Sequence, residues 1–372
     1  MKPLKYLFIS SMLFVATSCG NSWLDLEPST SVDTETSIKI LSDVEFTLNG
    51  IYSTMQSSDA YSGRLVYYGD VTGDDMQAVS STKRVANYYR FNFTKDDNPS
   101  SHWSYLYSII QNCNLILMNI DKLVIDEDDK AYRDDLKGEA LAIRGLALFD
   151  LTRIFGYPYL KDNGASLGVP IIEGLSTIDS KPTRNTVAQC YTKIIDDLTQ
   201  SLSLLGEKFN KGKINKWGAM VLLSRVYLYK GENANALKMA SDAIIGAEKN
   251  KYALWTNEDY PTAWGEDASA SKPGEVLFEI VNLTTDSPGK ESMGYLNSYD
   301  GYDDMCITCS FYQFLKEDPK DIRLKLLSFD KKYYAYVNKY QPQREENIED
   351  ANIPLIRLSE AYLNAAEAAV KE

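Results

Sequence analysis

Apolar residues recur at helical spacing through most of the chain. The first stripe has intervals of four, three and four residues and consists of Val44, Leu48, Ile51 and Met55. Such a repeat places side chains on one face of an α-helix. It predicts helices over about 42–57, 101–122, 136–154, 187–205, 215–230 and 233–247. Thr186 and Gln189 add capping-box spacing at the start of the fourth helix.

Two long stretches lack the helical repeat. Residues 58–101 and 251–310 are instead rich in Gly, Asp, Ser and Tyr, which is typical of loops. Within the second stretch, the alternating run at 276–281 predicts a β-strand. A last helix is predicted from Pro354 to the end, because proline is favoured at the first helical position.

The helices at 215–247 also carry the small-residue pattern of a tetratricopeptide helix pair. The pattern consists of Ser224, Tyr227, Gly231, Ala236, Ala240 and Ala243. Ser359, Tyr362 and Ala366 repeat its first half in the last helix, and no second half follows. We therefore expect a fragment or a truncated reading frame, with docking of the last helix on the body as the alternative. The predicted fold class is mainly α, with tetratricopeptide-like helix pairs and a loop-rich second part that contains a few short strands.

The N-terminus has the composition of an export signal. Lys2 and Lys5 precede an apolar run at 6–16, which is about half the roughly 20 residues that a transmembrane helix needs. Residues 16–19 (Ala-Thr-Ser-Cys) match a bacterial lipoprotein box, so we expect Cys19 to be lipidated. An ordinary cleaved signal with a chance cysteine is the alternative. The expected organisation is a signal peptide at 1–18, a helical region at 19–248 and an incomplete, loop-rich region at 249–372.

Charge and histidine content argue against several functions. The 52 acidic and 39 basic residues give a net charge of −13, which repels nucleic-acid phosphates. His102 is the only histidine, so a metal site that needs two histidines cannot form. We expect it to cap a helix or lie at the surface, and no GxSxG motif supports hydrolysis. We predict no catalytic residue, no metal and no cofactor.

Two small groups of residues leave alternatives open. Asp300, Asp303 and Asp304 surround Gly301 without the spacing of an EF-hand, so a solvated turn is preferred over a calcium site. The cysteines after residue 19 are Cys113, Cys190, Cys306 and Cys309. The first two fall on apolar helix faces and are expected to pack in the core. The last two form a CxxC without the second pair that zinc requires, and either a local disulfide or two free thiols fits.

Several motifs occur in the order and spacing of one known family. They are WLDLEP at 23–28, GDVT at 69–72, WSYLYSII at 103–110, EALAIR at 139–144, FDLTRIFG at 149–156, GVPII at 168–172 and IPLIRLSEAYLN at 353–364. Together with the lipoprotein box they resemble the SusD/RagB family of surface lipoproteins. Members of that family usually continue well past the last motif, which agrees with the expected truncation.

The resemblance implies an α-rich body with tetratricopeptide-like helix pairs and a loop-rich part that carries much of the ligand surface. It also implies a lipid anchor in the outer membrane, facing the exterior. There the protein would cover a TonB-dependent transporter and deliver captured glycans, or in some members peptides. The expected role is binding and not catalysis. A peptide-binding or protein-interaction scaffold and a secreted glycan hydrolase are the alternatives.

Loop aromatics and polar groups are the candidate glycan contacts, because sugar rings stack on flat aromatic faces. One segment supplies Tyr67, Tyr68, Asp70, Asp74, Tyr88, Tyr89 and Arg90. The other supplies Trp255, Trp264, Tyr295, Tyr299 and Tyr302. Any single loop aromatic more often pins its loop to the body, but we expect the two segments together to line a site. Trp103 and Trp217 lie on helical stripes and are expected in the core.

Overall fold

The computed structural model describes residues 37–94, 100–177, 179–265, 273–330, 334–342 and 347–372. The predicted signal peptide, Cys19 and the motif at 23–28 lie outside these residues. Within the described ranges, no helix combines the length and the apolar composition needed to cross a membrane.

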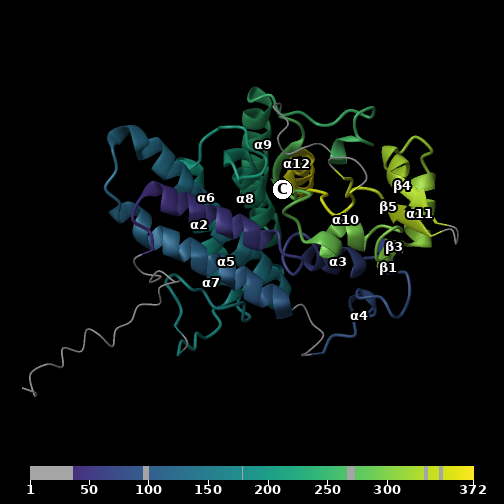
Figure 1. Cartoon of the computed structure of the whole chain (residues 1–372), viewed down its shortest axis with the longest axis horizontal. Helices are drawn as coiled ribbons and strands as arrows, with labels where there is room; N and C mark the ends of the chain where they lie inside the picture. Colours follow the sequence, from purple (N-terminus) through teal and green to yellow (C-terminus); the bar gives the residue numbers. More distant parts are fainter. Residues whose placement is uncertain (1–36, 95–99, 178, 266–272, 331–333, 343–346) are drawn as a thin grey trace, which may run out of the picture.

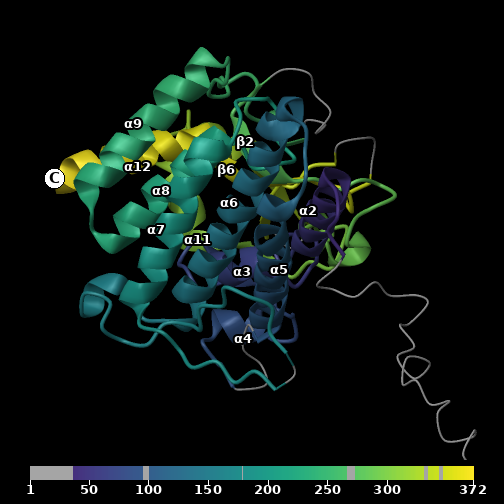
Figure 2. The same ribbon diagram turned by 90° about the vertical axis from the view of Figure 1, so that its left-hand side faces the viewer.

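Long helices stack side by side and form the helical body. They are α2 (Leu41–Met55), α5 (Ser100–Asn119), α6 (Lys130–Phe155), α7 (Val187–Leu204), α8 (Lys216–Lys230), α9 (Asn233–Lys249) and α12 (Leu358–Lys371). Each helix packs against the next in this order, as Figure 2 shows. Every helix that the apolar repeat predicts before residue 250 is therefore present, and the mainly α fold is confirmed.

The helix ends follow local capping chemistry. The predicted capping box of α7 is confirmed, because Gln189 N donates to Thr186 Oγ1 at 3.2 Å and Thr186 N donates to Gln189 Oε1 at 2.9 Å. The helix α6 begins earlier than predicted, since the acidic residues before it form a 3-10 turn, η4 (Glu127–Asp129), that leads directly into it. Gly156 follows its last residue.

The pair α8 and α9 has the predicted tetratricopeptide-like packing. Gly231 ends α8 with a left-handed φ of 81°. Ala236, Ala240 and Ala243 are fully buried, which allows the two helices to approach closely. The last helix, α12, docks on this pair, and Asn364 Nδ2 donates to Ser224 Oγ at 2.8 Å.

The predicted start of the last helix is wrong. Residues from Ile353 to Arg357 form strand β6, which pairs in antiparallel register with β2 (Val276–Ile280), the strand predicted from the alternating run. Pro354 therefore lies in a sheet opposite Glu279, and α12 begins at Leu358. A local proline preference is overridden here because β2 offers the segment a partner strand.

Short elements from 64–89 and 263–337 together form the loop-rich part of the fold, which lies at the right of Figure 1. Strand β1 (Met76–Ala78) pairs with β3 (Met305–Ile307), and β4 (Leu327–Phe329) pairs with β5 (Ala335–Val337). The short helices are α3 (Arg64–Val71), α4 (Ala86–Tyr89), α10 (Met293–Leu296) and α11 (Cys309–Lys316). The 3-10 turns of this part are η6 (Ala263–Gly265), η7 (Gly289–Glu291) and η8 (Ile322–Leu326), whereas η3 (Ile120–Lys122) and η5 (Tyr159–Lys161) follow α5 and α6 of the helical body. The stretch 58–101, expected to be loop, thus contains two short helices and a strand.

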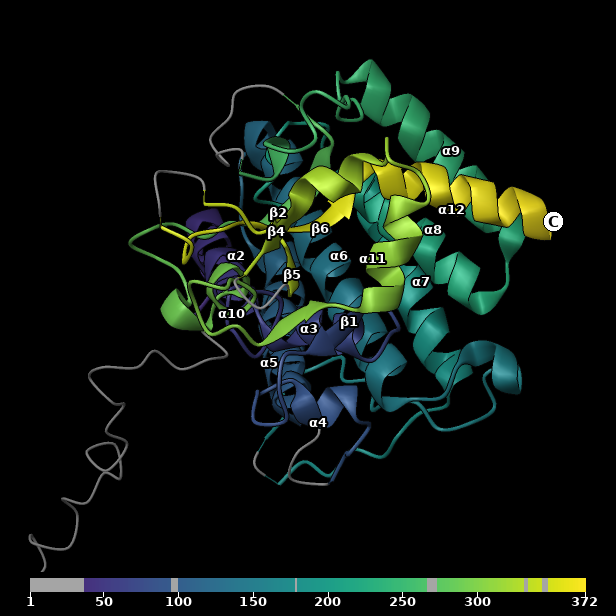
Figure 3. The ribbon, with the colours of Figure 1, turned by 90° about the vertical axis from the view of Figure 1, so that its right-hand side faces the viewer.

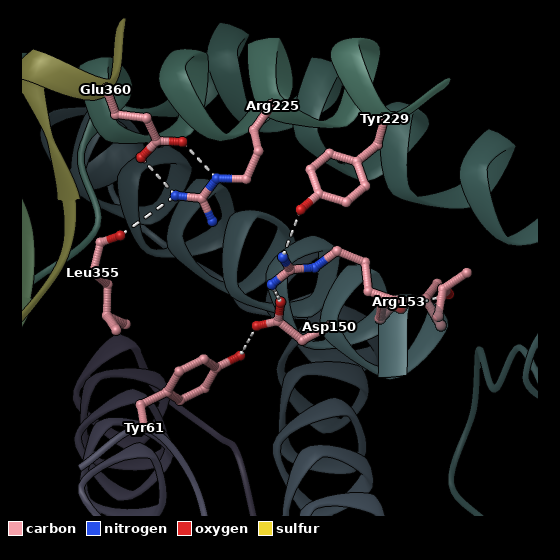
Figure 4. A network of polar contacts seen from close by, with 9 residues as sticks. Tyr61, Asp150, Arg153, Arg225, Tyr229, Leu355 and Glu360 are labelled. Carbon is pink, nitrogen blue, oxygen red and sulfur yellow. Dashed lines mark hydrogen bonds and ion pairs between the residues drawn. The ribbon is translucent and has the colours of Figure 1, made fainter. Parts of the chain in front are cut away.

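Buried and half-buried polar pairs fasten the helices to one another and to the C-terminal segment (Figure 4). Arg225 on α8 donates from Nε and Nη2 to the two carboxylate oxygens of Glu360 on α12 at 2.5 and 2.7 Å. Asp150 on α6 accepts hydrogen bonds from Tyr61 at 2.8 Å and from Arg153. Arg153 also donates from Nη1 to the hydroxyl of Tyr229 on α8 at 3.3 Å. These contacts join α6, α8 and α12 through charged groups that have their partners within the protein.

The described cysteines behave as two classes. Cys113 and Cys190 are fully buried, as predicted for core residues. Cys306 is buried and Cys309 is exposed, and both are free thiols.

Candidate ligand-binding site

A groove of about 740 Å³ lies beside β4, β5 and α10. Figure 3 views the molecule from the side on which these elements lie. We call it the aromatic groove. Its lining combines aromatic rings with side-chain amides: Asn297, Tyr299, Phe329, Tyr336, Asn338 and Tyr340. Its volume falls within the range of about 300–1,000 Å³ that is usual for ligand pockets.

Two rings of the aromatic groove are available for stacking. The side chains of Tyr299 and Phe329 are 46% and 51% exposed. The ring of Tyr299 lies 6.1 Å from that of Tyr336, at an interplanar angle of 50°. Tyr336 is 2% exposed and its hydroxyl donates to Asp303, so it supports Tyr299 from within. The arrangement offers exposed aromatic faces on a fixed base.

The segment that carries Tyr299 is held in a tight turn. Asp303 adopts a left-handed φ of 54°. A Cβ on Gly301 would come 2.0 Å from the carbonyl oxygen of Tyr295, so only glycine fits there. Tyr302 N donates to the same carbonyl at 2.9 Å, which closes the turn.

Asn297 supplies a polar group at the base of the aromatic groove. It follows the last residue of α10, and its Nδ2 donates to the carbonyl oxygen of Val337 at 2.9 Å. Its Oδ1 is buried and has no hydrogen-bond partner. A buried amide oxygen without a partner is costly in a folded protein, and a ligand hydroxyl could satisfy it.

The first predicted segment contributes little to this groove. Tyr67 and Tyr88 are 1% and 9% exposed and pack against each other in the core, while Tyr68 is half-buried among Tyr88, Phe93 and His102. The exposed members are Asp70, Asp74, Tyr89 and Arg90. Of these, Asp70 lines a second cavity beside the aromatic groove.

The second predicted segment divides in the same way. Trp264 is 6% exposed and packs against the half-buried Trp255, with the guanidinium of Arg357 4.7 Å from its ring. Tyr295 and Tyr302 are half-buried and pack edge to face at 5.0 Å. Of the predicted aromatics in this segment, Tyr299 lines the aromatic groove.

The structure does join the two segments, although not around one shared cavity. Strands β1 and β3 pair, and the guanidinium of Arg84 lies 3.9 Å from the ring of Tyr302. Lys83 Nζ lies 3.5 Å from Asp303 Oδ2. Most of the predicted aromatics therefore pin their loops to the body.

A family model described as "Starch-binding associating with outer membrane" matches residues 22–228, more than half of the chain. The chain belongs to the SusD-like family. A SusD-like protein P2 from Formosa agariphila is 28% identical over 313 residues, which cover 81% of this chain and 57% of that protein. The chain thus spans little more than half the length of this relative.

Solved structures of SusD-like proteins share the fold. A putative sugar binding protein from Bacteroides vulgatus is 83% identical, with a TM-score of 0.89 over 90% of this chain and 75% of that one. A SusD superfamily protein from Bacteroides thetaiotaomicron is 37% identical, with a TM-score of 0.82 over 90% of this chain and 76% of that one.

Sequence reasoning missed several groove residues of this SusD-like chain. Phe329, Tyr336, Asn338 and Tyr340 all lie outside the two predicted segments. A signal was present, since 334–340 reads Tyr-Ala-Tyr-Val-Asn-Lys-Tyr and is as aromatic as the segments that were selected. Pairing of β4 with β5 brings this run beside Tyr299, and nothing local in the sequence predicts that pairing.

The only histidine does not lie where it was expected. His102 is fully buried near the start of α5, and its Nδ1 lies 2.6 Å from the carbonyl oxygen of Asp59. Burial lowers the pKa of its imidazole, so the neutral form is favoured. It is neither a surface residue nor accessible to a substrate. In the described residues, no cluster of His, Cys, Asp or Glu side chains has the arrangement of a metal site.

Proposed function

We propose that this protein is a surface-exposed lipoprotein that binds oligosaccharides or polysaccharides and delivers them to a TonB-dependent outer-membrane transporter. The observation that carries the binding role is the aromatic groove, where exposed Tyr299 and Phe329 lie beside amide groups. Membership of a family described as starch-binding supports it. The role is capture without chemical change, and the burial of His102 supports this.

Binding is tested by affinity electrophoresis against starch, a β-glucan, a xylan, a mannan and a pectin. Retardation of the wild-type protein by one of them is expected. Tyr299→Ala should weaken binding about tenfold, because it removes an exposed stacking face. Tyr132→Ala is the matched control, since Tyr132 is 40% exposed on α6, in the helical body.

The test separates binding from hydrolysis and from peptide binding. The chain length of the bound polysaccharide should be unchanged after incubation, whereas a shortened product would indicate an enzyme. Retention of a tryptic peptide pool, with no glycan retarded, would overturn the glycan assignment and favour the peptide-binding alternative.

Anchoring and delivery need separate experiments in cells. Cys19→Ser should abolish incorporation of labelled palmitate and release the protein from the outer membrane. Crosslinking in intact cells should recover a TonB-dependent transporter with the wild-type protein. Recovery of the wild-type protein in the periplasm, without lipid, would contradict the proposed location.

A further inference from the structure

A second cavity of about 290 Å³ adjoins the aromatic groove, and we call it the charged cavity. It lies between α3, β1, α11 and η8, and it shares Asn297, Val337 and Tyr340 with the lining of the groove. A ligand in the groove therefore lies next to the charged cavity. Its size is close to the lower end of the range for ligand pockets, about 300 Å³.

Charged side chains from distant segments meet in this cavity: Asp70, Asp75, Arg323 and Lys339. The charge of Arg323 is already balanced, because its Nη2 donates to Asp321 Oδ2 at 2.6 Å and its Nε lies within 3.1 Å of both carboxylate oxygens. Two carboxylates and one ammonium group remain. The charged cavity therefore carries one unbalanced negative charge.

Asp70 and Lys339 lack hydrogen-bonding partners in the described part of the protein, and the ammonium of Lys339 lies 5.2 Å from the ring of Trp264. Neither side chain has a hydrogen bond or ion pair with another described residue. Asp70 is exposed at the cavity and Lys339 is half-buried. Partial desolvation by the surrounding protein raises the pKa of Asp70 and lowers that of Lys339. The positive charge of Lys339 partly offsets the rise in the pKa of Asp70, and the negative charge of Asp70 partly offsets the fall in the pKa of Lys339. Both groups gain free energy from a partner that donates to the carboxylate and accepts from the ammonium.

The rest of the charged cavity is largely apolar. Its apolar members include Met76, Met305, Phe311, Leu315 and Leu326. A sugar unit has a rim of hydroxyls, each of which both donates and accepts, and C–H faces that pack on apolar side chains. This lining matches both features, and the buried Oδ1 of Asn297, which has no hydrogen-bond partner, adds an acceptor at the boundary with the groove.

We propose that the charged cavity binds one neutral, hydroxyl-rich unit of the saccharide in the aromatic groove, and that its carboxylates exclude uronate and sulfate units. This inference rests on the proposed function, because it assigns a substrate class to the same region. A uronate carboxylate would meet two carboxylates for one ammonium group, and like charges repel. The net charge of −13 on the whole chain acts in the same direction.

The test uses an array of hexasaccharides of equal length. The neutral probes are malto-, laminari-, cello-, xylo- and mannohexaose, and the acidic probe is hexagalacturonate. The wild-type protein should bind at least one neutral hexasaccharide and leave hexagalacturonate unbound. Lys339→Met should weaken neutral binding about tenfold through the loss of a charge-assisted hydrogen bond. Lys325→Met, at an exposed lysine of η8, is the matched control.

The double variant Asp70→Asn/Asp75→Asn tests the exclusion directly. Both amides still offer hydrogen bonds, so neutral binding should fall only a few-fold, while hexagalacturonate should become detectable. Asp74→Asn, in the same loop and exposed, should change neither. A purely structural role for the two carboxylates would not produce a gain of acidic binding. Thermal melts of all variants show whether they remain folded.

The outcomes separate this inference from the proposed function. If Tyr299→Ala abolishes neutral binding while Lys339→Met and the double variant do not alter it, the groove binds glycan and the charged cavity does not. A wild-type preference for hexagalacturonate, or no gain of acidic binding in the double variant, overturns the exclusion. If a polysaccharide retards the protein but no hexasaccharide binds, this inference fails and the proposed function stands, whereas both fail if neither binds.

Discussion

Charged and amide groups have different partners in the helical body and in the loop-rich part. In the body, Arg144 donates to both oxygens of Asp197 at 2.8 and 2.6 Å and to Asn114 Oδ1 at 2.8 Å. In the loop-rich part, Asp70, Lys339 and the Oδ1 of Asn297 have no such partners. The body uses its polar groups to fix helices, whereas the other part leaves groups that a ligand can satisfy.

Some buried groups of the helical body also lack hydrogen-bond partners. His102 Nε2 and Trp217 Nε1 are buried without hydrogen bonds in the body. Neither residue lines the aromatic groove or the charged cavity. Unpaired groups therefore indicate a ligand site only where a cavity adjoins them.

The largest expected effect is on the buried ion pair of the body. Arg144→Met leaves the carboxylate of Asp197, which is fully buried, with only Lys193 Nζ at 3.2 Å. We expect a loss of about 3–5 kcal/mol in the free energy of unfolding, measured by urea denaturation. Arg144→Met/Asp197→Leu should recover most of it. An unchanged midpoint in the single variant would show that the body does not depend on this pair.

The next effect concerns the pH dependence of the body. Burial raises the pKa of Glu139 from 4.5 to about 7, and Tyr52 donates to its carboxylate at 2.7 Å. The folded protein then holds this proton more tightly than the unfolded chain, so this group stabilises the fold most below pH 4.5. Its contribution should fall, on the order of 3 kcal/mol, as the pH rises to about 7.

Glu139→Gln should remove that decrease, because the amide keeps an acceptor for Tyr52 and does not titrate. The measurement is the melting temperature between pH 4.5 and 7.5. Glu127→Gln, whose side chain is 89% exposed, should follow the wild type. The same slope in Glu139→Gln as in the wild type would assign the pH dependence to another group.

Two glycine-to-alanine substitutions compare the effect of a steric clash in the helical body with that of a clash in the loop-rich part. A Cβ on Gly246 of α9 would lie 2.0 Å from the buried ring of Trp217, and one on Gly294 of α10 would lie 2.1 Å from the carbonyl oxygen of Ile348. Gly246→Ala should lower the free energy of unfolding by about 1–3 kcal/mol through overpacking, against the usual gain for alanine in a helix. Urea denaturation measures this loss.

Gly294→Ala should instead act mainly on glycan affinity, since Gly294 and Ile348 both line the aromatic groove and must separate. Affinity electrophoresis of both variants on the same polysaccharide gives the comparison. Equal losses of affinity in the two variants would mean that the groove is no more sensitive than the body.

The smallest expected effect on stability is at an exposed ring. Phe329→Ser should change the free energy of unfolding by no more than about 0.5 kcal/mol, because the side chain is half exposed. Glycan affinity should fall by a few-fold. Phe46→Ser on α2, where the ring is 71% exposed, should change neither quantity. Isothermal titration measures the glycan affinity of the two variants, and thermal melts measure their stability.

The sequence by itself determined the helical body. Its apolar repeats, capping box and small residues predicted each long helix before residue 250. The buried face of a helix is formed by residues that lie close together in the sequence at regular spacing, so it can be recognised there. The motifs also led to the correct family. The start of α12 was missed because a partner strand, β2, decided the conformation of 353–357.

Tertiary structure alone decided the binding surface. Whether a loop aromatic can stack on a ligand or instead holds its loop to the body depends on which other segments of the chain cover it. Tyr299 is 46% exposed, whereas Trp264 is 6% exposed. Phe329, Lys339 and Asp70 lie far apart in the sequence, and pairing of short strands and packing of turns bring them to adjoining cavities. Such contacts leave no periodic pattern in the local sequence. The sequence therefore indicates which residue types suit a binding site, but not which of them come together in the fold.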